Sequence, residues 1–304
     1  MIRYVDRANL DEEKYNYCIE NAIESRVYAF SWYLDIVCDN WGVLVLEDYM
    51  AVMPVPYRVK FLIKYVYPPL WIIELGIFSL KENLNYSLFY RFLNKKFSFI
   101  EIRLNTDNTL FKSDDFLTKK LQFLNLNNNY EYILNGYNRN RKREVLKAKK
   151  NNLQVNWNDN PEKLISIFKE NVGYKLKNIK AKDYENLLKL MEICLKNGVG
   201  ELLTIYDVSN KLLAAAFFLK HKNTVTQLVC ASDISNRKNG VHTFFNDRAI
   251  FKYQKSFEIY NFGGSSMKNI SNYYKSFGAK DLDYNQYQKI KFPSLIRFFK
   301  RLKS

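Results

Sequence analysis

The order of the predicted strands and helices constrains this fold most, because the same order occurs twice along the chain. From residue 153 onward, the hydrophobic pattern predicts a strand, two helices, three strands, a helix, a strand, a helix and a last strand. Residues 1–135 give the same order, starting with a strand at Met1–Val5. Three successive strands followed by alternating helices and strands are typical of a mixed sheet with helices on both faces. We therefore predict an α/β fold (an α+β-type mixed sheet) of two similar domains, each with a mostly antiparallel sheet.

The expected domains are residues 1–135 and 136–304, and a basic helix over 136–152 opens the second. No sequence similarity between the halves supports this repeat, which rests on the predicted elements alone. The repeat in the first half depends on three further elements, of which the helix has the weaker pattern. They are a strand at Trp71–Ile77, a helix at Ser113–Phe123 and a strand at Tyr130–Leu134.

The charge balance predicts an anionic partner. The chain has 304 residues with 47 Lys and Arg against 31 Asp and Glu, a formal net charge of +16. Such an excess suits tRNA, a pyrophosphate-bearing substrate or an acidic membrane surface, but codon usage in an AT-rich genome explains it equally well. The last segment, FPSLIRFFKRLKS, is expected to form a helix after Pro293. That helix fits either peripheral contact with a membrane or docking onto its own domain.

The cysteines and histidines show no pattern of metal ligands. The four cysteines lie far apart without a CxxC pair, and there are two histidines, so we expect no metal site. Isolated cysteines in mostly apolar runs indicate reduced core thiols in a cytoplasmic protein. No apolar run follows the charged start, which argues against a signal peptide, and the longest apolar stretch is too short for a membrane span.

Two segments carry residue patterns that suggest chemistry. The first is the basic helix, whose cations wind around it and leave little apolar stripe; it is either a solvated linker or an anion-binding surface. Its distinctive residues are Arg139, Arg143, Lys147, Ala148 and Lys150. The second runs from Tyr260 to Lys280, where a strand leads into two glycines and then a helix that ends in a Phe-Gly pair. Glycines after a strand allow close approach of a substrate, and the N–H groups of the helix start can hold an anion.

Together with the element order, these segments resemble the GNAT acyltransferase superfamily, and within it the FemAB-like branch with two tandem GNAT halves. The second segment matches through Phe262, Gly263, Gly264, Tyr274, Lys275, Phe277 and Gly278. The resemblance implies transfer of an acetyl, acyl or aminoacyl group from acyl-CoA or aminoacyl-tRNA to an amine, such as a cell-envelope precursor. It implies no tightly bound cofactor, because the donor is a co-substrate. The alternative is an inactive tandem GNAT scaffold that binds RNA or an anionic lipid through its cations.

The resemblance also assigns roles within the second half. Tyr274 would protonate the leaving group, and Lys275 would neutralise or orient the substrate. Gly263 and Gly264 would let the substrate approach the backbone, and the cations Arg139, Arg143 and Lys147 would hold its anionic part. Asp233, which follows the third strand of this half, is a candidate base or anchor for the amine. The working cleft is expected in the second half.

A third feature bears on the donor. GNAT enzymes carry R/Q-x-x-G-x-G/A after the third strand, and its backbone amides bind the pyrophosphate of acyl-CoA. Here Arg237, Asn239 and Gly240 fit the start of that pattern, while His242 replaces the last small residue. A bulky side chain there opposes the close approach of CoA and leaves room for aminoacyl-tRNA. Amides near Val229 to Ala231 would polarise the carbonyl. From the sequence pattern we interpret His242 as a partly exposed residue at a helix start, not as a catalytic one.

Overall fold

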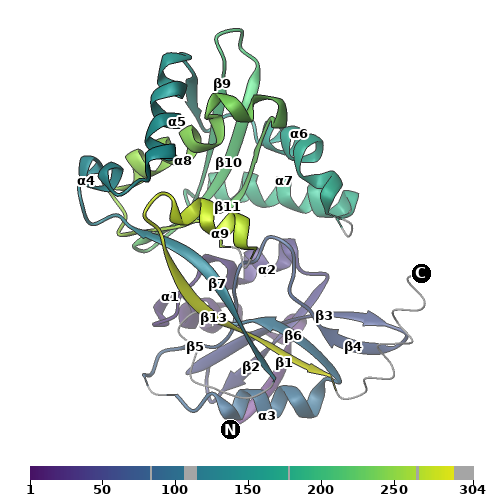
Figure 1. The fold of residues 1–304 in the computed structure, drawn as a ribbon. Helices are drawn as coiled ribbons and strands as arrows, with labels where there is room; N and C mark the ends of the chain where they lie inside the picture. The colour runs from purple at the N-terminus through teal and green to yellow at the C-terminus, as the bar shows by residue number, and fades with distance from the viewer. Residues whose placement is uncertain (83, 106–114, 177–178, 265–266, 291–304) are drawn as a thin grey trace. The chain divides into compact units, whose positions relative to one another are not determined.

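The computed structural model describes the chain except residues 83, 106–114, 177–178, 265–266 and 291–304, together with the side chains of 175 and 236–238. The described chain forms two compact units, one of residues 1–119 with 283–304 and one of residues 120–282 (Figure 1). These bounds differ from the expected division at 135/136. The chain leaves the first unit within strand β7 (Phe116–Asn125) and returns to it within β13 (Lys280–Ile290).

The first unit is built on a mixed sheet. Strands β1 to β4 pair in sequence as antiparallel neighbours, β6 lies parallel to β4, and β13 lies antiparallel to β6. The strands are β1 (Ile2–Asp6), β2 (Asn40–Leu46), β3 (Ala51–Lys60), β4 (Ile63–Val66), β5 (Phe78–Ser79), which pairs with β3, and β6 (Phe99–Arg103). The helices are α1 (Glu12–Asn21), α2 (Ser31–Val37) and α3 (Ser87–Lys96). Strand β2 is buried along nearly its whole length, which explains its continuous apolar sequence.

The second unit repeats this plan. Strands β8 to β11 are antiparallel neighbours, β12 lies parallel to β11, and β7 lies antiparallel to β12. The strands are β8 (Gln154–Trp157), β9 (Gly200–Tyr206), β10 (Leu212–His221), β11 (Thr224–Ser232) and β12 (Ile259–Asn261). The helices are α4 (Tyr130–Asn135), α5 (Arg139–Lys150), α6 (Glu162–Asn171), α7 (Ala181–Lys196), α8 (Val241–Tyr253) and α9 (Lys268–Lys275). Helices α5 and α8 pack together, while α6 packs against β10 and β11 and α7 against β9 (Figure 1).

The predicted α/β architecture and the element order of the second half are confirmed, but three predictions for the first half are wrong. The predicted helix at Ser113–Phe123 is mostly strand β7, and the predicted strand at Tyr130–Leu134 is helix α4. Strand β7 is set by pairing with β12, more than 130 residues away along the chain, which local periodicity cannot reveal. Helix α4 does have a local signal, because the Asn129 side chain accepts a hydrogen bond from the Tyr132 N–H at 2.9 Å.

The third wrong prediction is the strand at Trp71–Ile77. This segment is largely irregular, and the paired strands are β4 before it and β5 after it. Two prolines, Pro68 and Pro69, lie between β4 and this segment; they donate no backbone N–H and interrupt strand pairing. The predicted helix after Pro293 lies outside the described residues.

A carboxylate network fixes the start of α6 to the sheet, and it predicts how stability depends on pH. Burial raises the pKa of Asp159, but hydrogen bonds from Tyr206, Lys163, Asn160 and Thr204 outweigh it and hold the pKa at about 2.

A carboxylate whose pKa is lower in the folded state than in the unfolded state stabilises the fold at pH values above its unfolded-state pKa, which is about 4 for an aspartate. Wild type is therefore expected to lose up to about 2 kcal/mol from this group as the pH falls from 4 to 2. Asp159→Asn should have a lower free energy of unfolding than wild type at pH 7, and it should lose less of that free energy between pH 4 and 2. Urea titrations at several pH values measure both, and identical pH profiles of the two proteins would contradict the role of Asp159.

Candidate active site

Strand β11 separates from β12 partway along its length. The two strands pair only where Thr224–Thr226 lie beside Ile259–Asn261. Just beyond, the register of β11 against β10 shifts, so that Leu228 is the extra residue of a β-bulge. The remaining residues of β11 stay paired with β10 but leave β12. Parallel strands that diverge in this way open a gap in a sheet, which a substrate can enter.

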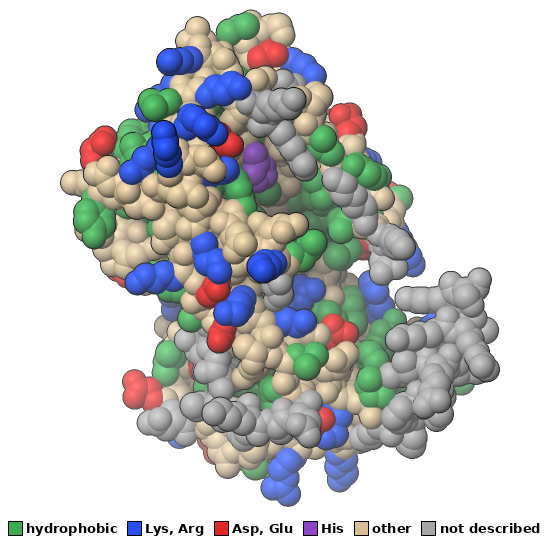
Figure 2. Space-filling view, in the orientation of Figure 1, with side chains coloured by type: hydrophobic (Ala, Val, Ile, Leu, Met, Phe, Trp, Pro, Cys, Tyr) green, Lys and Arg blue, Asp and Glu red, His purple; other side chains and the backbone are tan. Residues whose placement is uncertain are grey.

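A cavity of about 520 Å³ lies at this divergence, entirely within the second unit. Its walls come from α5, the end of α6, β11, the start of α8 and α9. Figure 2 shows a histidine side chain in a hollow beside hydrophobic and cationic side chains. The lining residues are Arg141, Glu144, Asn171, Val172, Cys230, Ala231, Ser232, Gly240, His242, Thr243, Asn269, Ile270, Tyr273 and Tyr274.

One wall carries a charged cluster between α5 and α8. The Arg141 guanidinium lies 3.0 Å from the Glu144 carboxylate and donates to the Thr243 hydroxyl at 2.7 Å. The Thr243 hydroxyl donates in turn to the Glu144 carboxylate. The Arg141 side chain is 15% exposed, yet its Nε is buried and has no hydrogen-bond partner among the described residues. An unpaired buried donor costs about 1–3 kcal/mol.

His242 and two tyrosines form the opposite part of the wall. His242 Nδ1 lies 3.1 Å from the Ser232 hydroxyl, and its ring contacts that of Tyr273 at a centroid distance of 5.0 Å. The Tyr273 ring also lies under the Arg141 guanidinium, at 4.7 Å. These contacts hold the imidazole by one nitrogen and by one face, at the end of the diverging strand.

Tyr274 reaches the cavity from α9 with 8% of its surface exposed, and its ring stacks on Phe262 at 4.6 Å. Burial, reinforced by the nearby Cys230 and Tyr273, raises the pKa of Tyr274 well above its usual range. The hydroxyl therefore stays protonated at any working pH, as a proton donor requires. Burial likewise raises the pKa of the cavity thiol, Cys230, to about 12, so that it stays a neutral thiol.

Ala231, Gly240 and Tyr274 are the predicted site residues that the structure brings together in the cavity. The Asp233 carboxylate instead accepts hydrogen bonds from Lys211 Nζ at 2.8 Å and from the Ser235 hydroxyl. Lys275 is exposed on α9, with its Nζ 3.3 Å from the Asp281 carboxylate. Neither Asp233 nor Lys275 is among the described residues that line the cavity.

The glycines predicted to meet the substrate pack against neighbouring backbone. Gly240 begins α8 with φ of 76°, and a methyl group added there would lie 2.6 Å from the Glu144 carbonyl oxygen. Gly264 has φ of 66°, and its added methyl would lie 2.7 Å from the Cα of Leu121. Gly263, with φ of 74°, donates its N–H to the Asn261 side chain at 2.9 Å. Close packing and left-handed backbone thus explain the first two glycines.

The remaining predicted residues lie around the cavity. Val229 is buried and pairs with Phe217, and Asn239 is half-buried in the 3-10 turn before Gly240. The Arg237 side chain lies outside the described part of the structure. The cations Arg139, Arg143 and Lys147 are exposed at four-residue spacing on the outer side of α5, where Figure 2 shows a gathering of blue side chains.

Sequence reasoning missed Arg141 and Tyr273 as cavity residues, and it placed His242 at a helix start without a catalytic role. A signal for Arg141 was present, because it shares a face of α5 with the two buried residues Val145 and Ala148, four and seven positions on. No comparable signal gives His242 a role, because its contact with Ser232 at the end of β11 forms only in the folded chain.

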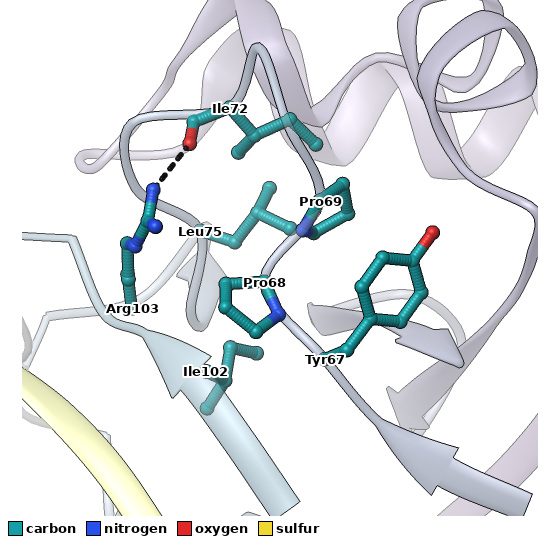
Figure 3. A pocket seen from close by; sticks show the side chains of 7 residues that line it. All are labelled: Tyr67, Pro68, Pro69, Ile72, Leu75, Ile102 and Arg103. Atoms are coloured by element: carbon teal, nitrogen blue, oxygen red, sulfur yellow. Dashed lines mark hydrogen bonds between the residues drawn. The ribbon is translucent and has the colours of Figure 1, made fainter. Parts of the chain in front are cut away.

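The same divergence in the first unit is closed (Figure 3). Strand β4 pairs with β6 only at Val66 and Ile100, and the chain then continues through Pro68 and Pro69. The space there is about 10 Å³, room for roughly one water. It is lined by Tyr67, Pro68, Pro69, Ile72, Leu75, Ile102 and Arg103, and Arg103 donates to the Ile72 carbonyl at 3.1 Å. Prolines supply no N–H to polarise a carbonyl, so this counterpart is unsuited to bind an acyl group.

Comparisons with solved structures identify the fold. FemX superposes with a TM-score of 0.65 and 13% identity, covering 94% of this chain and 97% of that one. The C-terminal domain of a putative lysylphosphatidylglycerol synthetase from Agrobacterium fabrum gives 0.59 at 9% identity, covering 93% and 92%. A tandem GNAT protein from the clavulanic acid biosynthesis pathway gives 0.55 at 10% identity, covering 96% and 99%.

The chain therefore has the GNAT/FemAB-like fold, as the sequence patterns predicted. No protein-family model matches the sequence, and no curated protein does. At these identities the superpositions establish the fold and not an activity. Within the described residues, none of the helices combines the length and apolar character that crossing a bilayer requires.

Proposed function

We propose that this protein is an N-acyltransferase whose reaction takes place in the cavity between β11, α5, α8 and α9. The observation that carries the proposal is the divergence of β11 from β12, which opens a cavity of about 520 Å³ in the second unit. The corresponding divergence of β4 from β6 in the first unit leaves only a small space lined by prolines. Amides of Ala231 and its neighbours at the end of β11 would polarise the acyl carbonyl. The donor is an acyl thioester or an aminoacyl ester, and the acceptor is an amine, such as that of a cell-envelope precursor.

The cavity residues supply the proton transfers that the reaction needs. The protonated acceptor amine gives one proton to His242, which releases it to solvent. The neutral nitrogen then attacks the carbonyl carbon, and the bond from that carbon to the leaving oxygen or sulfur breaks. Tyr274 gives its hydroxyl proton to the leaving group, and the second proton, which the nitrogen loses as the amide forms, restores the tyrosine. The strongly raised pKa of Tyr274 suits a basic alkoxide better than a thiolate, which favours an ester donor.

The first test is for transfer itself. The purified chain is incubated with acetyl-CoA or with charged tRNAs, together with a panel of amines, and acylated products are detected by mass spectrometry. A product that requires the intact cavity supports the proposal. The exposed cations of α5 favour an alternative, a scaffold that binds RNA. Salt-sensitive RNA binding with no transfer from any donor would select that alternative.

The role of His242 predicts a pH-dependent defect. His242→Ala is expected to lower kcat/KM by about 100-fold at pH 7, because a general base contributes about 10²–10⁴-fold. The defect should shrink as the pH rises toward the pKa of the acceptor amine, since more of that amine is then already deprotonated. His221→Ala is the matched control, because His221 ends β10 and is not among the described cavity residues. An equal loss in both variants, or a defect independent of pH, would remove His242 from the mechanism.

A further inference from the structure

We propose that Glu144 determines donor specificity by occupying the position at the start of α8 where a pyrophosphate would otherwise bind. On this view the cavity excludes donors of the coenzyme A type and accepts an ester whose phosphates lie elsewhere. The inference rests on the proposed function, since it names the donor class for the same cavity. It is carried by the placement of α5 against α8.

Glu144 meets the first turn of α8 with both its backbone and its side chain. Its carbonyl oxygen leaves no room for a methyl group at Gly240, the residue that begins the helix. Its carboxylate accepts a hydrogen bond from the hydroxyl of Thr243, the third residue of α8. The start of a helix combines unpaired N–H groups with the positive end of the helix dipole, which is why anions bind there. In this chain an anion that belongs to the protein already lies at that end.

The charges around Glu144 also disfavour a second anion. Arg141 lies 3.0 Å from the carboxylate, so its positive charge is already balanced. A diphosphate entering the cavity would face a carboxylate whose side chain is 32% exposed, and Arg141 is the only cation among the described residues that line the cavity.

The test compares the binding of coenzyme A to wild type and to Glu144→Gln. Glutamine keeps an acceptor for the Thr243 hydroxyl, removes the negative charge and releases Arg141. Calorimetric titration at low salt should give a Kd in the millimolar range for wild type and at least tenfold tighter binding for the variant. The double variant Glu144→Gln with Arg141→Gln should lose most of that gain. Glu131→Gln, at an exposed position of α4, is the matched control and should bind as wild type does.

Tight binding of coenzyme A to wild type, or an equal gain in Glu131→Gln, would overturn the inference. If Glu144→Gln lowers the melting temperature, Glu144→Ala removes the same charge and is measured in its place, and a gain in neither variant overturns the inference as well. The result is separable from the proposed function. Efficient transfer from acetyl-CoA by wild type would refute the role of Glu144 and still confirm acyl transfer. Tighter binding of coenzyme A by Glu144→Gln, without transfer from any donor, would support the role of Glu144 and refute acyl transfer.

Discussion

Tyr274→Phe is expected to lower kcat about 10²- to 10⁴-fold while leaving the binding of the donor nearly unchanged. Tyr274 is one of the α9 residues that line the cavity, and burial keeps its hydroxyl protonated. Without this hydroxyl the leaving group must depart unprotonated, which raises the barrier of the chemical step only. Single-turnover rates measured with a product-based assay would separate this effect from product release.

Tyr137→Phe is the matched control for Tyr274→Phe. Tyr137 is a buried tyrosine of the same unit, its hydroxyl has no partner among the described residues, and it is not among the described residues that line the cavity. Its variant should retain wild-type rates. If both variants lose activity equally, the Tyr274 hydroxyl acts through packing, and its role as a proton donor is refuted.

Gly264→Ala is expected to destabilise the fold by about 2–5 kcal/mol. A non-glycine residue with positive φ costs about 1–2 kcal/mol, and forcing extra volume into packed structure costs about 1–3 kcal/mol. Both apply at Gly264, where φ is 66° and the new methyl would lie 2.5 Å from Leu121 Cδ2 and 2.7 Å from its Cα. The backbone of β7 cannot move away without disturbing its pairing with β12. Urea denaturation of the purified variant would measure the loss.

Gly198→Ala measures the part of that loss due to backbone conformation, so the difference between the two variants gives the part due to packing. Gly198 has φ of 71°, nearly the same conformation, but no heavy atom lies within 4 Å of an added methyl among the described residues. It should therefore cost only about 1–2 kcal/mol. Equal losses of stability at the two glycines would show that Leu121 moves aside and accommodates the new methyl group. A stable Gly264→Ala with lost activity would instead support the substrate role that the sequence suggested for this loop.

The second half of the chain was largely predictable, because its elements have local signals. Strands β9 to β11 are long apolar runs separated by turns, and a proline precedes α6 while a glycine follows α7. The first half was less predictable. Strand β7 alternates exposed and buried residues only in part, and its partner is far away along the chain. The candidate site was predicted only in part for a related reason, since Arg141 and Tyr273 reach the cavity through contacts between segments that are distant along the chain.

The sequence by itself predicted the α/β architecture, the element order of the second half, the glycine positions, and a tyrosine on the helix that follows β12. These features depend on periodicity and on backbone conformations that neighbouring residues dictate. The tertiary structure alone decided which charged and aromatic side chains face the cavity of the second unit. Arg141, Glu144 and His242 come from helices that meet only when α5 packs against α8, and such contacts between distant segments leave no local pattern to detect.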